Sequence, residues 1–261
     1  MRRIAVAALV TDEETVIEVG AGTGLLTVCL AERARRLIAV EVDEGLAIRL
    51  DERFAADEQV SVLRRDVLEA TPEELLVAGG GRVPYVVVGN LPYFIGTAII
   101  RRFLEATVRP RRLIVTLQAE VAESIAAPPG RMSYLSVEMQ TRASAKVLFY
   151  LPPKAFKPPP KVRSAVVRLD VLETSDAEVD DREAFLALVR AGFAAPRKRL
   201  RNSLAIGLRV PASEASAIFW DAGVDADQRP AVLTLPDWQS VYFAYRGSQE
   251  PGARSQEPSG S

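Results

Sequence analysis

The stretch VIEVGAGTG, residues 16–24, is the first indication of the fold of this chain. The β-branched run over residues 16–20 predicts a strand, and its glycines predict a tight turn into a helix over residues 24–34. Such a turn lets a ligand lie against bare backbone at the helix N-terminus. The spacing G-x-G-x-G lacks the Lys-Ser/Thr ending of a P-loop, and on its own it also fits a plain strand-to-helix turn.

Short β-branched runs alternate with helix-length segments from residue 16 to about residue 170. This alternation indicates a parallel sheet covered on both faces. A Pro-rich turn joins the last two runs and is too short for a crossover helix, so we expect them to pair antiparallel. The predicted strands are 16–20, 37–43, 60–66, 85–90, 111–118, 145–151 and 162–170. We therefore predict an α/β fold with a Rossmann-like, mostly parallel seven-stranded sheet and an antiparallel last strand.

Beyond residue 171 the strand pattern ends, and helical patterns follow at residues 184–192, 200–208 and 212–222. They predict a small α-helical domain over residues 173–246, after a first domain over residues 1–172. Residues 247–261 repeat Ser-Gln-Glu-Pro and predict a disordered tail. The tryptophans of the second domain, Trp220 and Trp238, are predicted to lie in its core.

The composition excludes several kinds of site. The 261 residues include no histidine and one cysteine, Cys29, which we expect to be buried in a helix. Ser-His-Asp and Cys-His machinery, a disulfide framework and a Cys-rich zinc site are therefore excluded, and we expect no metal. The apolar residues 4–10 predict a short amphipathic helix, and no apolar run approaches the roughly 18 residues of a membrane span. We expect a cytoplasmic protein.

Polar side chains follow the predicted strands at the edge where open α/β sheets bind ligands. Glu41 ends the second strand, 21 residues after Gly20, and a carboxylate there can accept both hydroxyls of a ribose. Asp66 ends the third strand, where its carboxylate or the adjoining backbone of Val67 can meet an adenine amine. We interpret this edge as a nucleoside site.

The tetrad Asn90-Leu91-Pro92-Tyr93 ends the fourth strand and favours chemistry over a simple turn. An adenine N6 amine is a poor nucleophile because its lone pair is delocalised into the ring. The Asn90 oxygen and a nearby backbone carbonyl can each accept one N–H, which aims the lone pair at an electrophile without a base. Pro92 fixes the turn, and Tyr93 offers a face on which an extruded base can stack.

The Pro-rich stretch FKPPPKV, residues 156–162, fits a stiff polyproline connector or an SH3-type ligand. Because it joins two strands of one sheet, a free ligand is disfavoured. We predict that Phe156 supplies the second wall of a stacking pocket, with Lys157 and Lys161 near phosphates.

The formal charge of −1 hides an uneven distribution. Residues 81–170 carry 14 basic and 5 acidic side chains, whereas residues 1–80 carry 9 and 16. A second basic cluster begins a predicted helix just after Pro196, where cations oppose the helix dipole by about 0.3–1 kcal/mol each if exposed. We interpret this cluster as an RNA phosphate site rather than a solvated face. It consists of Arg197, Lys198, Arg199 and Arg201.

Together these features resemble the small-subunit ribosomal RNA adenine dimethyltransferase family, class I enzymes that use S-adenosylmethionine to convert two adjacent adenosines near the end of 16S-type rRNA to N6,N6-dimethyladenosine. The resemblance rests on EVGAGTG (18–24), Glu41, Asp66, GNLPY (89–93), LQAEVAESI (117–125), SYLSVEMQ (133–140), FKPPPKVRSAVVRL (156–169) and PRKRLRNSL (196–204).

The resemblance implies roles for individual residues. The adenine is expected to lie against Asn90, Leu91, Pro92, Tyr93 and Phe156. The cofactor is expected to lie against Glu18, Gly20, Gly22, Gly24, Glu41, Asp66, Val67 and Asn90. The implied partner is small-subunit rRNA in a pre-formed 30S-type particle, bound by a monomer without a membrane or a metal.

The family normally carries a Gln-Asn-Phe-Leu segment before the first helix, which covers the cofactor, and this chain begins at the helix itself. We expect weaker cofactor binding as a result. Two alternatives are kept. The nearest related enzyme is a large-subunit rRNA adenine methyltransferase of the macrolide-resistance type, and the missing segment suggests a ribosome-assembly factor without catalysis. The PRKRLRNSL segment and Leu91 favour the small-subunit group.

Overall fold

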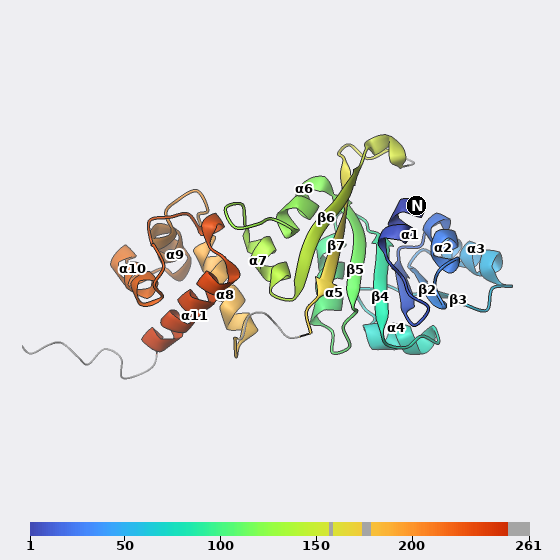
Figure 1. Ribbon diagram of the computed structural model, residues 1–261, viewed down its shortest axis with the longest axis horizontal. Coiled ribbons are helices and arrows are strands. Elements are labelled where there is room, and N and C mark those ends of the chain that lie inside the picture. Colours follow the sequence, from blue (N-terminus) through green and yellow to red (C-terminus); the bar gives the residue numbers. More distant parts are fainter. Residues whose placement is uncertain (157–158, 174–178, 250–261) are drawn as a thin grey trace, which may run out of the picture. The chain divides into compact units, whose positions relative to one another are not determined.

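The computed structural model describes residues 1–156, 159–173 and 179–249 (Figure 1). The chain divides into two compact units. Residues 1–126 and 142–173 form the first unit, and residues 127–141 belong to the second, together with the described residues from 179 onward. The interval 127–141 thus departs from the predicted boundary, because a C-terminal core of non-local contacts includes Met132 and Val137.

A seven-stranded sheet forms the centre of the first unit, in the order β3-β2-β1-β4-β5-β7-β6. The strands β1 to β5 run parallel to one another, and β7 runs antiparallel to both β5 and β6. The predicted mixed sheet is therefore confirmed. The strands are β1 (Thr15–Val19), β2 (Arg36–Glu41), β3 (Val60–Arg64), β4 (Tyr85–Asn90), β5 (Arg112–Gln118), β6 (Ala143–Leu151) and β7 (Ser164–Val171).

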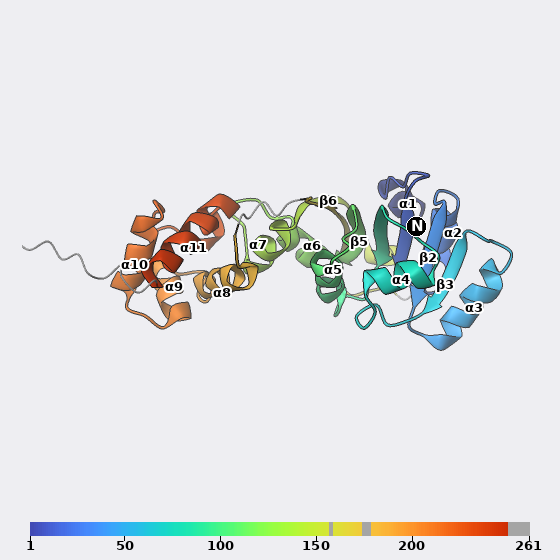
Figure 2. The same ribbon diagram turned by 90° about the horizontal axis from the view of Figure 1, so that it is seen from below.

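Helices cover both faces of this sheet. Figure 2 shows α1 and α2 on one side of the central strands and α4 on the other. The first face buries Val16, Leu37 and Val88 against apolar side chains of α1 and α2, such as Ile4 and Leu30. The helices of this unit are α1 (Arg2–Ala7), α2 (Leu25–Ala31), α3 (Glu44–Phe54), α4 (Pro72–Ala78), α5 (Gly96–Glu105) and α6 (Ala119–Ile125). A 3-10 turn, η1 (Pro153–Ala155), follows β6.

A buried ion pair fixes the segment between α1 and β1 to the sheet. Arg112, at the start of β5, donates two hydrogen bonds to the carboxylate of Glu14, at 2.6 and 2.9 Å. The same guanidinium donates to the carbonyls of Ala8 and Leu9, which satisfies backbone acceptors at the end of α1. Burial opposes ionisation of Glu14, but hydrogen bonds from Arg112 and Thr11 outweigh it and hold the Glu14 pKa below its usual value.

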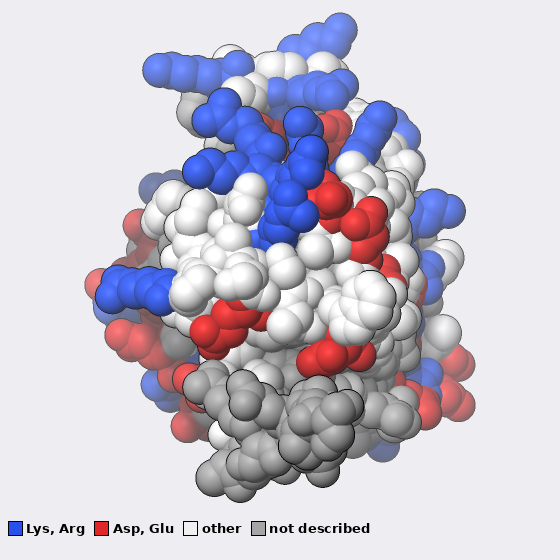
Figure 3. Space-filling view, turned by 90° about the vertical axis from the view of Figure 1, so that its left-hand side faces the viewer, with Lys and Arg blue, Asp and Glu red and all other residues white. Residues whose placement is uncertain are grey.

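The second unit is helical, as predicted. Its core includes Phe185, Leu204, Phe219, Trp238 and Tyr242, all fully buried. Figure 3 shows one face of the molecule, on which Lys and Arg side chains gather in one area beside an area without charged side chains. The helices are α7 (Tyr134–Gln140), α8 (Arg182–Gly192), α9 (Leu200–Leu208), α10 (Ala212–Asp221), the 3-10 turn η2 (Pro230–Val232) and α11 (Leu235–Gln249).

Three predictions about single elements are wrong. Trp220 is 85% exposed, because it projects from the side of α10 opposite the buried Ile218 and Phe219. Cys29 is only half-buried in α2. Residues 247–249 extend α11, whereas the rest of the predicted disordered tail lies outside the described residues. Within the described part of the chain, no helix is long and apolar enough to cross a membrane.

Candidate active site

The glycine turn after β1 has the conformation that its sequence predicts. Gly20, Gly22 and Gly24 adopt φ values of 70°, 58° and 78°, in the left-handed region that other residues rarely enter. The Gly20 N–H donates to the Val40 carbonyl, which holds the turn against the end of β2. A Cβ at Gly24 would lie 2.8 Å from the Leu50 side chain of α3, which would then have to move, and the positive φ of Gly24 also favours glycine here.

Glu41, the last residue of β2, joins this turn to the next one. Its Oε2 accepts the Gly22 N–H at 2.8 Å, and its Oε1 accepts the N–H groups of Val42 and Asp43 at 2.9 and 3.0 Å. An ionised carboxylate has about four acceptor positions, so these bonds leave room for one further donor. A ribose hydroxyl can take that position, and a second hydroxyl has to replace one backbone N–H.

Glu18 is a buried carboxyl group in the middle of β1, between Ala39 and Val88 on the neighbouring strands. Burial raises its pKa to about 8, and the nearby negative charge of Glu41 acts in the same direction. An interaction with the Thr27 hydroxyl opposes part of this rise in the Glu18 pKa. Among the described residues, Glu18 Oε2 and Thr27 Oγ1 nevertheless lack a partner at hydrogen-bond geometry. Buried polar atoms without a partner are costly, and a polar ligand would satisfy them.

Asp66 and Val67 lie in the turn after β3, which ends at Arg64 and not at Asp66 as predicted. The Asp66 Oδ1 atom accepts the Leu68 N–H at 2.8 Å, and Val67 is buried. This turn adjoins Glu41, because the Arg65 N–H donates to the Glu41 carbonyl.

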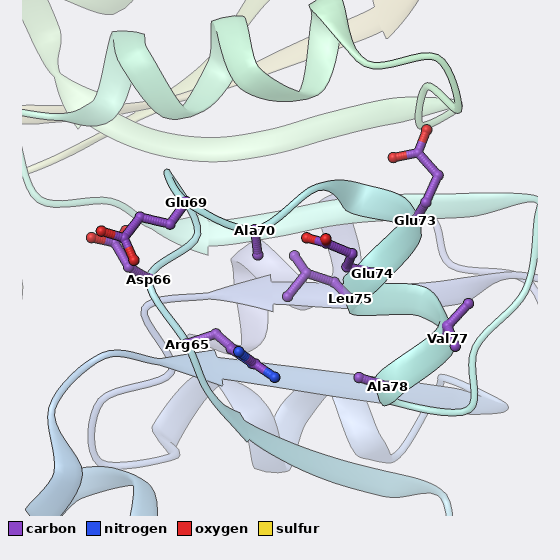
Figure 4. Close-up of a pocket in the computed structure, with 9 residues that line it drawn as sticks. All are labelled: Arg65, Asp66, Glu69, Ala70, Glu73, Glu74, Leu75, Val77 and Ala78. Carbon is purple, nitrogen blue, oxygen red and sulfur yellow. The ribbon is translucent and has the colours of Figure 1, made fainter.

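A cavity of about 670 Å³ lies between this turn and α4 (Figure 4). In Figure 4 the carboxylates of Asp66 and Glu69 extend from the turn, and Leu75 and Ala78 come from α4. Of the predicted cofactor residues that the structure describes, only Asp66 lines this cavity. The cavity is therefore a neighbour of the predicted cofactor site rather than the site itself.

The Asn-Leu-Pro-Tyr turn lies directly beside the glycine turn. Asn90 ends β4, paired with Thr116, and its side chain is half-buried. A Cβ added at Gly20 would lie 4.0 Å from the Asn90 carbonyl oxygen, so these two segments, far apart in sequence, approach each other closely. Leu91 is buried beneath the turn, and Pro92 is exposed.

Tyr93 is anchored from a strand that the sequence does not connect to it. Its half-buried phenol hydroxyl forms a 2.5 Å hydrogen bond with the hydroxyl of Ser164, the first residue of β7. Tyr93 follows β4 in the chain, and its hydroxyl bonds to the start of β7, so the ring is fixed at both ends. A ring fixed in this way can serve as a stacking surface for a base. Sequence reasoning missed Ser164, because its pairing with Tyr93 depends on the position of β7 in the sheet.

A second aromatic residue at this turn was also missed. Phe94 follows Tyr93 directly and is 87% exposed, although a phenylalanine at a turn is normally covered. It leads into α5, whose first residue is Gly96. The sequence did contain an indication of this residue, because Phe94 is an aromatic side chain directly after a segment predicted to bind a base.

The Pro-rich segment is described in part. Phe156 is half-buried at the end of η1, and Lys161 is exposed, and their roles at a base and at phosphates stay predictions. Lys157 lies outside the described residues. The residues that follow this segment contact the site. Ser164 bonds to Tyr93, and the carbonyl of the preceding Arg163 accepts the Ala119 N–H.

The predicted basic cluster of the second unit is divided into two parts. Arg197 and Lys198 are exposed and precede α9, which begins at Leu200, so the cluster does not open the helix directly after Pro196 as predicted. Arg199 and Arg201 both pair with Asp227, at 3.2 and 2.5 Å. Across the described residues no three His, Cys, Asp or Glu side chains come together as a metal site.

Comparisons with known proteins agree with this arrangement. Residues 1–238 match the family model described as ribosomal RNA adenine dimethylase. The chain is 38% identical over 248 residues to "Ribosomal RNA small subunit methyltransferase A" of Dehalococcoides mccartyi, covering 95% of this chain and 84% of the relative. It is 41% identical over 223 residues to the protein of the same name from Acidobacterium capsulatum, covering 85% and 77%.

Two solved structures share the architecture. The 23S rRNA methyltransferase ErmE superposes with a TM-score of 0.73 at 30% identity, covering 93% of this chain and 95% of ErmE. A dimethyladenosine transferase from Plasmodium falciparum gives a TM-score of 0.79 at 21% identity and covers 94% of both chains, which supports the fold. The sequence match over most of the chain and the shared sheet lead to one assignment: this chain belongs to the ribosomal RNA adenine dimethylase family.

Proposed function

We propose that this chain transfers methyl groups from S-adenosylmethionine to N6 of two adjacent adenosines near the 3′ end of small-subunit rRNA, and so takes part in small-subunit maturation. The observation that carries this proposal is the close approach of the Asn90 backbone to Gly20. It brings the Asn90 turn, which can accept hydrogen bonds from an amine, next to the glycine turn, which can hold a cofactor. The product is N6,N6-dimethyladenosine.

The cofactor fits the residues present. The left-handed glycine turn leaves backbone open to a ligand, the Glu41 carboxylate retains one acceptor position for a ribose hydroxyl, and Glu18 has a buried oxygen without a partner among the described residues. We assign Glu18, the glycine turn, Glu41, and Asp66 with Val67 to cofactor binding. Once bound, S-adenosylmethionine supplies a methyl group on a positively charged sulfur.

Asn90 positions the amine that receives the methyl group. Its side-chain oxygen and a nearby backbone carbonyl accept the N6 hydrogens, so that the nitrogen lone pair points away from the ring plane toward the methyl group. Tyr93, held by Ser164, stacks on the adenine. The N6 proton becomes acidic once the new N–C bond has formed, so it can leave to water, and a chain without histidine needs no general base.

The relatives favour a small-subunit substrate. Proteins named as small-subunit methyltransferases match at 36–41% identity over most of the chain. The 30% identity with the 23S enzyme ErmE keeps large-subunit RNA as the second candidate substrate. We further propose that a monomer binds rRNA within a pre-formed 30S-type particle in the cytoplasm, with the exposed Lys161, Arg197 and Lys198 near phosphates.

The test uses labelled S-adenosylmethionine and unmethylated ribosomal subunits, followed by analysis of the nucleosides. Dimethyladenosine from the small subunit supports the proposal. Methylated adenosine from large-subunit RNA would show that the second candidate, large-subunit rRNA, is the substrate. Stable binding to small subunits without transfer of label would instead indicate an assembly factor.

A further inference from the structure

Trp220 is an exposed aromatic side chain that the proposed catalytic site does not use. It is the penultimate residue of α10 and is 85% exposed, whereas the other tryptophan, Trp238, is fully buried. Aromatic side chains of this kind offer about 150–250 Å² of contact surface, and most of it is left in water here. An uncovered tryptophan offers a ring face on which a flat ligand can stack.

The fold places Trp220 at the same end of the second unit as the basic cluster. α9 and α10 are packed neighbours joined by the short segment 209–211, so the end of α10 lies near the beginning of α9. The segment after α10 returns to that point, because the N–H groups of Leu200 and Arg201 donate to the carbonyls of Gln228 and Ala226.

The charge at this end favours an anionic ligand. The segments that meet there, 197–201 and 221–229, carry five cations and three carboxylates, a net excess of two positive charges. Asp227 already pairs with Arg199 and Arg201. Arg197 and Lys198 are exposed, and neither forms an ion pair with any described residue.

An uncovered indole at the same end of the unit as two exposed cations fits single-stranded nucleic acid, since bases stack on aromatic rings while Lys and Arg contact the phosphates. Tryptophan and arginine are also common in protein interfaces, but the excess of positive charge at this end favours a polyanion over a protein partner. We infer that Trp220 stacks on an unpaired base of the rRNA substrate, with Arg197 and Lys198 on the adjoining phosphates. This inference rests on the proposed function and adds to it a contact with the RNA made by the second unit.

The experiment measures the affinity of Trp220→Ala and Trp220→Phe for unmethylated small ribosomal subunits at several KCl concentrations. We expect the alanine variant to bind about 5- to 100-fold more weakly and the phenylalanine variant to keep most of the affinity. Because tryptophan is uncharged, the affinity of both Trp220 variants should depend on the KCl concentration as the affinity of the wild type does. In the double variant Arg197→Ala/Lys198→Ala, the slope of log affinity against log salt should fall by about 1.5.

The control is Phe243→Ala, which removes a half-exposed aromatic side chain from α11 and should leave the affinity unchanged. Tryptophan fluorescence gives a second readout, since bound RNA should quench Trp220 in the wild type.

An alanine variant that binds and methylates subunits like the wild type, or wild-type emission that RNA does not change, would overturn the inference alone. Wild-type protein that binds through Trp220 but transfers no methyl group would overturn the proposed function and leave the RNA contact standing.

Discussion

Replacing Glu18 by glutamine should change how the stability of the protein depends on pH. Glu18 is 1% exposed, and burial raises its pKa to about 8, from a usual value of 4.5 that applies in the unfolded chain. The folded state therefore holds this proton more tightly than the unfolded state. The contribution of the protonated group to the free energy of unfolding is complete below about pH 4.5 and is lost as the pH rises toward 8.

The size of the effect follows from the two pKa values. They differ by about 3.5, and at 1.36 kcal/mol per pKa unit the full loss is about 5 kcal/mol. Glutamine is neutral at every pH and keeps the shape of the side chain. Between pH 5 and 8, the free energy of unfolding of the wild type should thus fall relative to Glu18→Gln by about 1.4 kcal/mol per pH unit.

Urea unfolding of both proteins at pH 5, 6, 7 and 8 measures this difference, and all other titrating groups cancel in the comparison. The control is Glu13→Gln, which removes an exposed carboxylate five residues earlier and should give a curve parallel to the wild type. Curves for Glu18→Gln and wild type that stay parallel from pH 5 to 8 would refute the reasoning, because they would show that Glu18 is ionised throughout.

Three further predictions concern the site and its support. Asn90→Ala should abolish methyl transfer and leave S-adenosylmethionine affinity nearly unchanged; near-normal turnover would remove Asn90 from the positioning role. Glu14→Gln breaks the buried pair with Arg112 and should lower the free energy of unfolding by about 3–5 kcal/mol near pH 7. The difference from the wild type should become smaller below pH 4.5, as the wild-type carboxylate becomes protonated. Equal urea midpoints at pH 7 would contradict this. Phe94→Ala, which removes an exposed ring next to Tyr93, should raise KM for the ribosomal substrate several-fold without loss of stability, whereas an unchanged KM would exclude contact with RNA.

Local patterns in the sequence determined the elements of this fold. The seven β-branched runs correspond to the seven strands, and the central ones, such as β1 and β4, are near-continuous apolar runs of the kind that a sheet covered on both faces buries. The glycine turn was equally predictable, since Gly20, Gly22 and Gly24 occupy backbone conformations that other residues rarely adopt. Both properties belong to short segments and need no distant partner.

The tertiary structure alone decided which segments meet. The insertion of β7 between β5 and β6 places Ser164 against Tyr93, 71 residues apart, and no local pattern contains that pairing. Burial also depends on neighbours that are distant in sequence. It raises the pKa of Glu18. Trp220, in contrast, is exposed, although a large aromatic residue in a helical domain suggested a core position. The sequence by itself thus determined the strands, the turns and the residue types of the site, and the packing of remote segments decided their contacts, charge states and exposure.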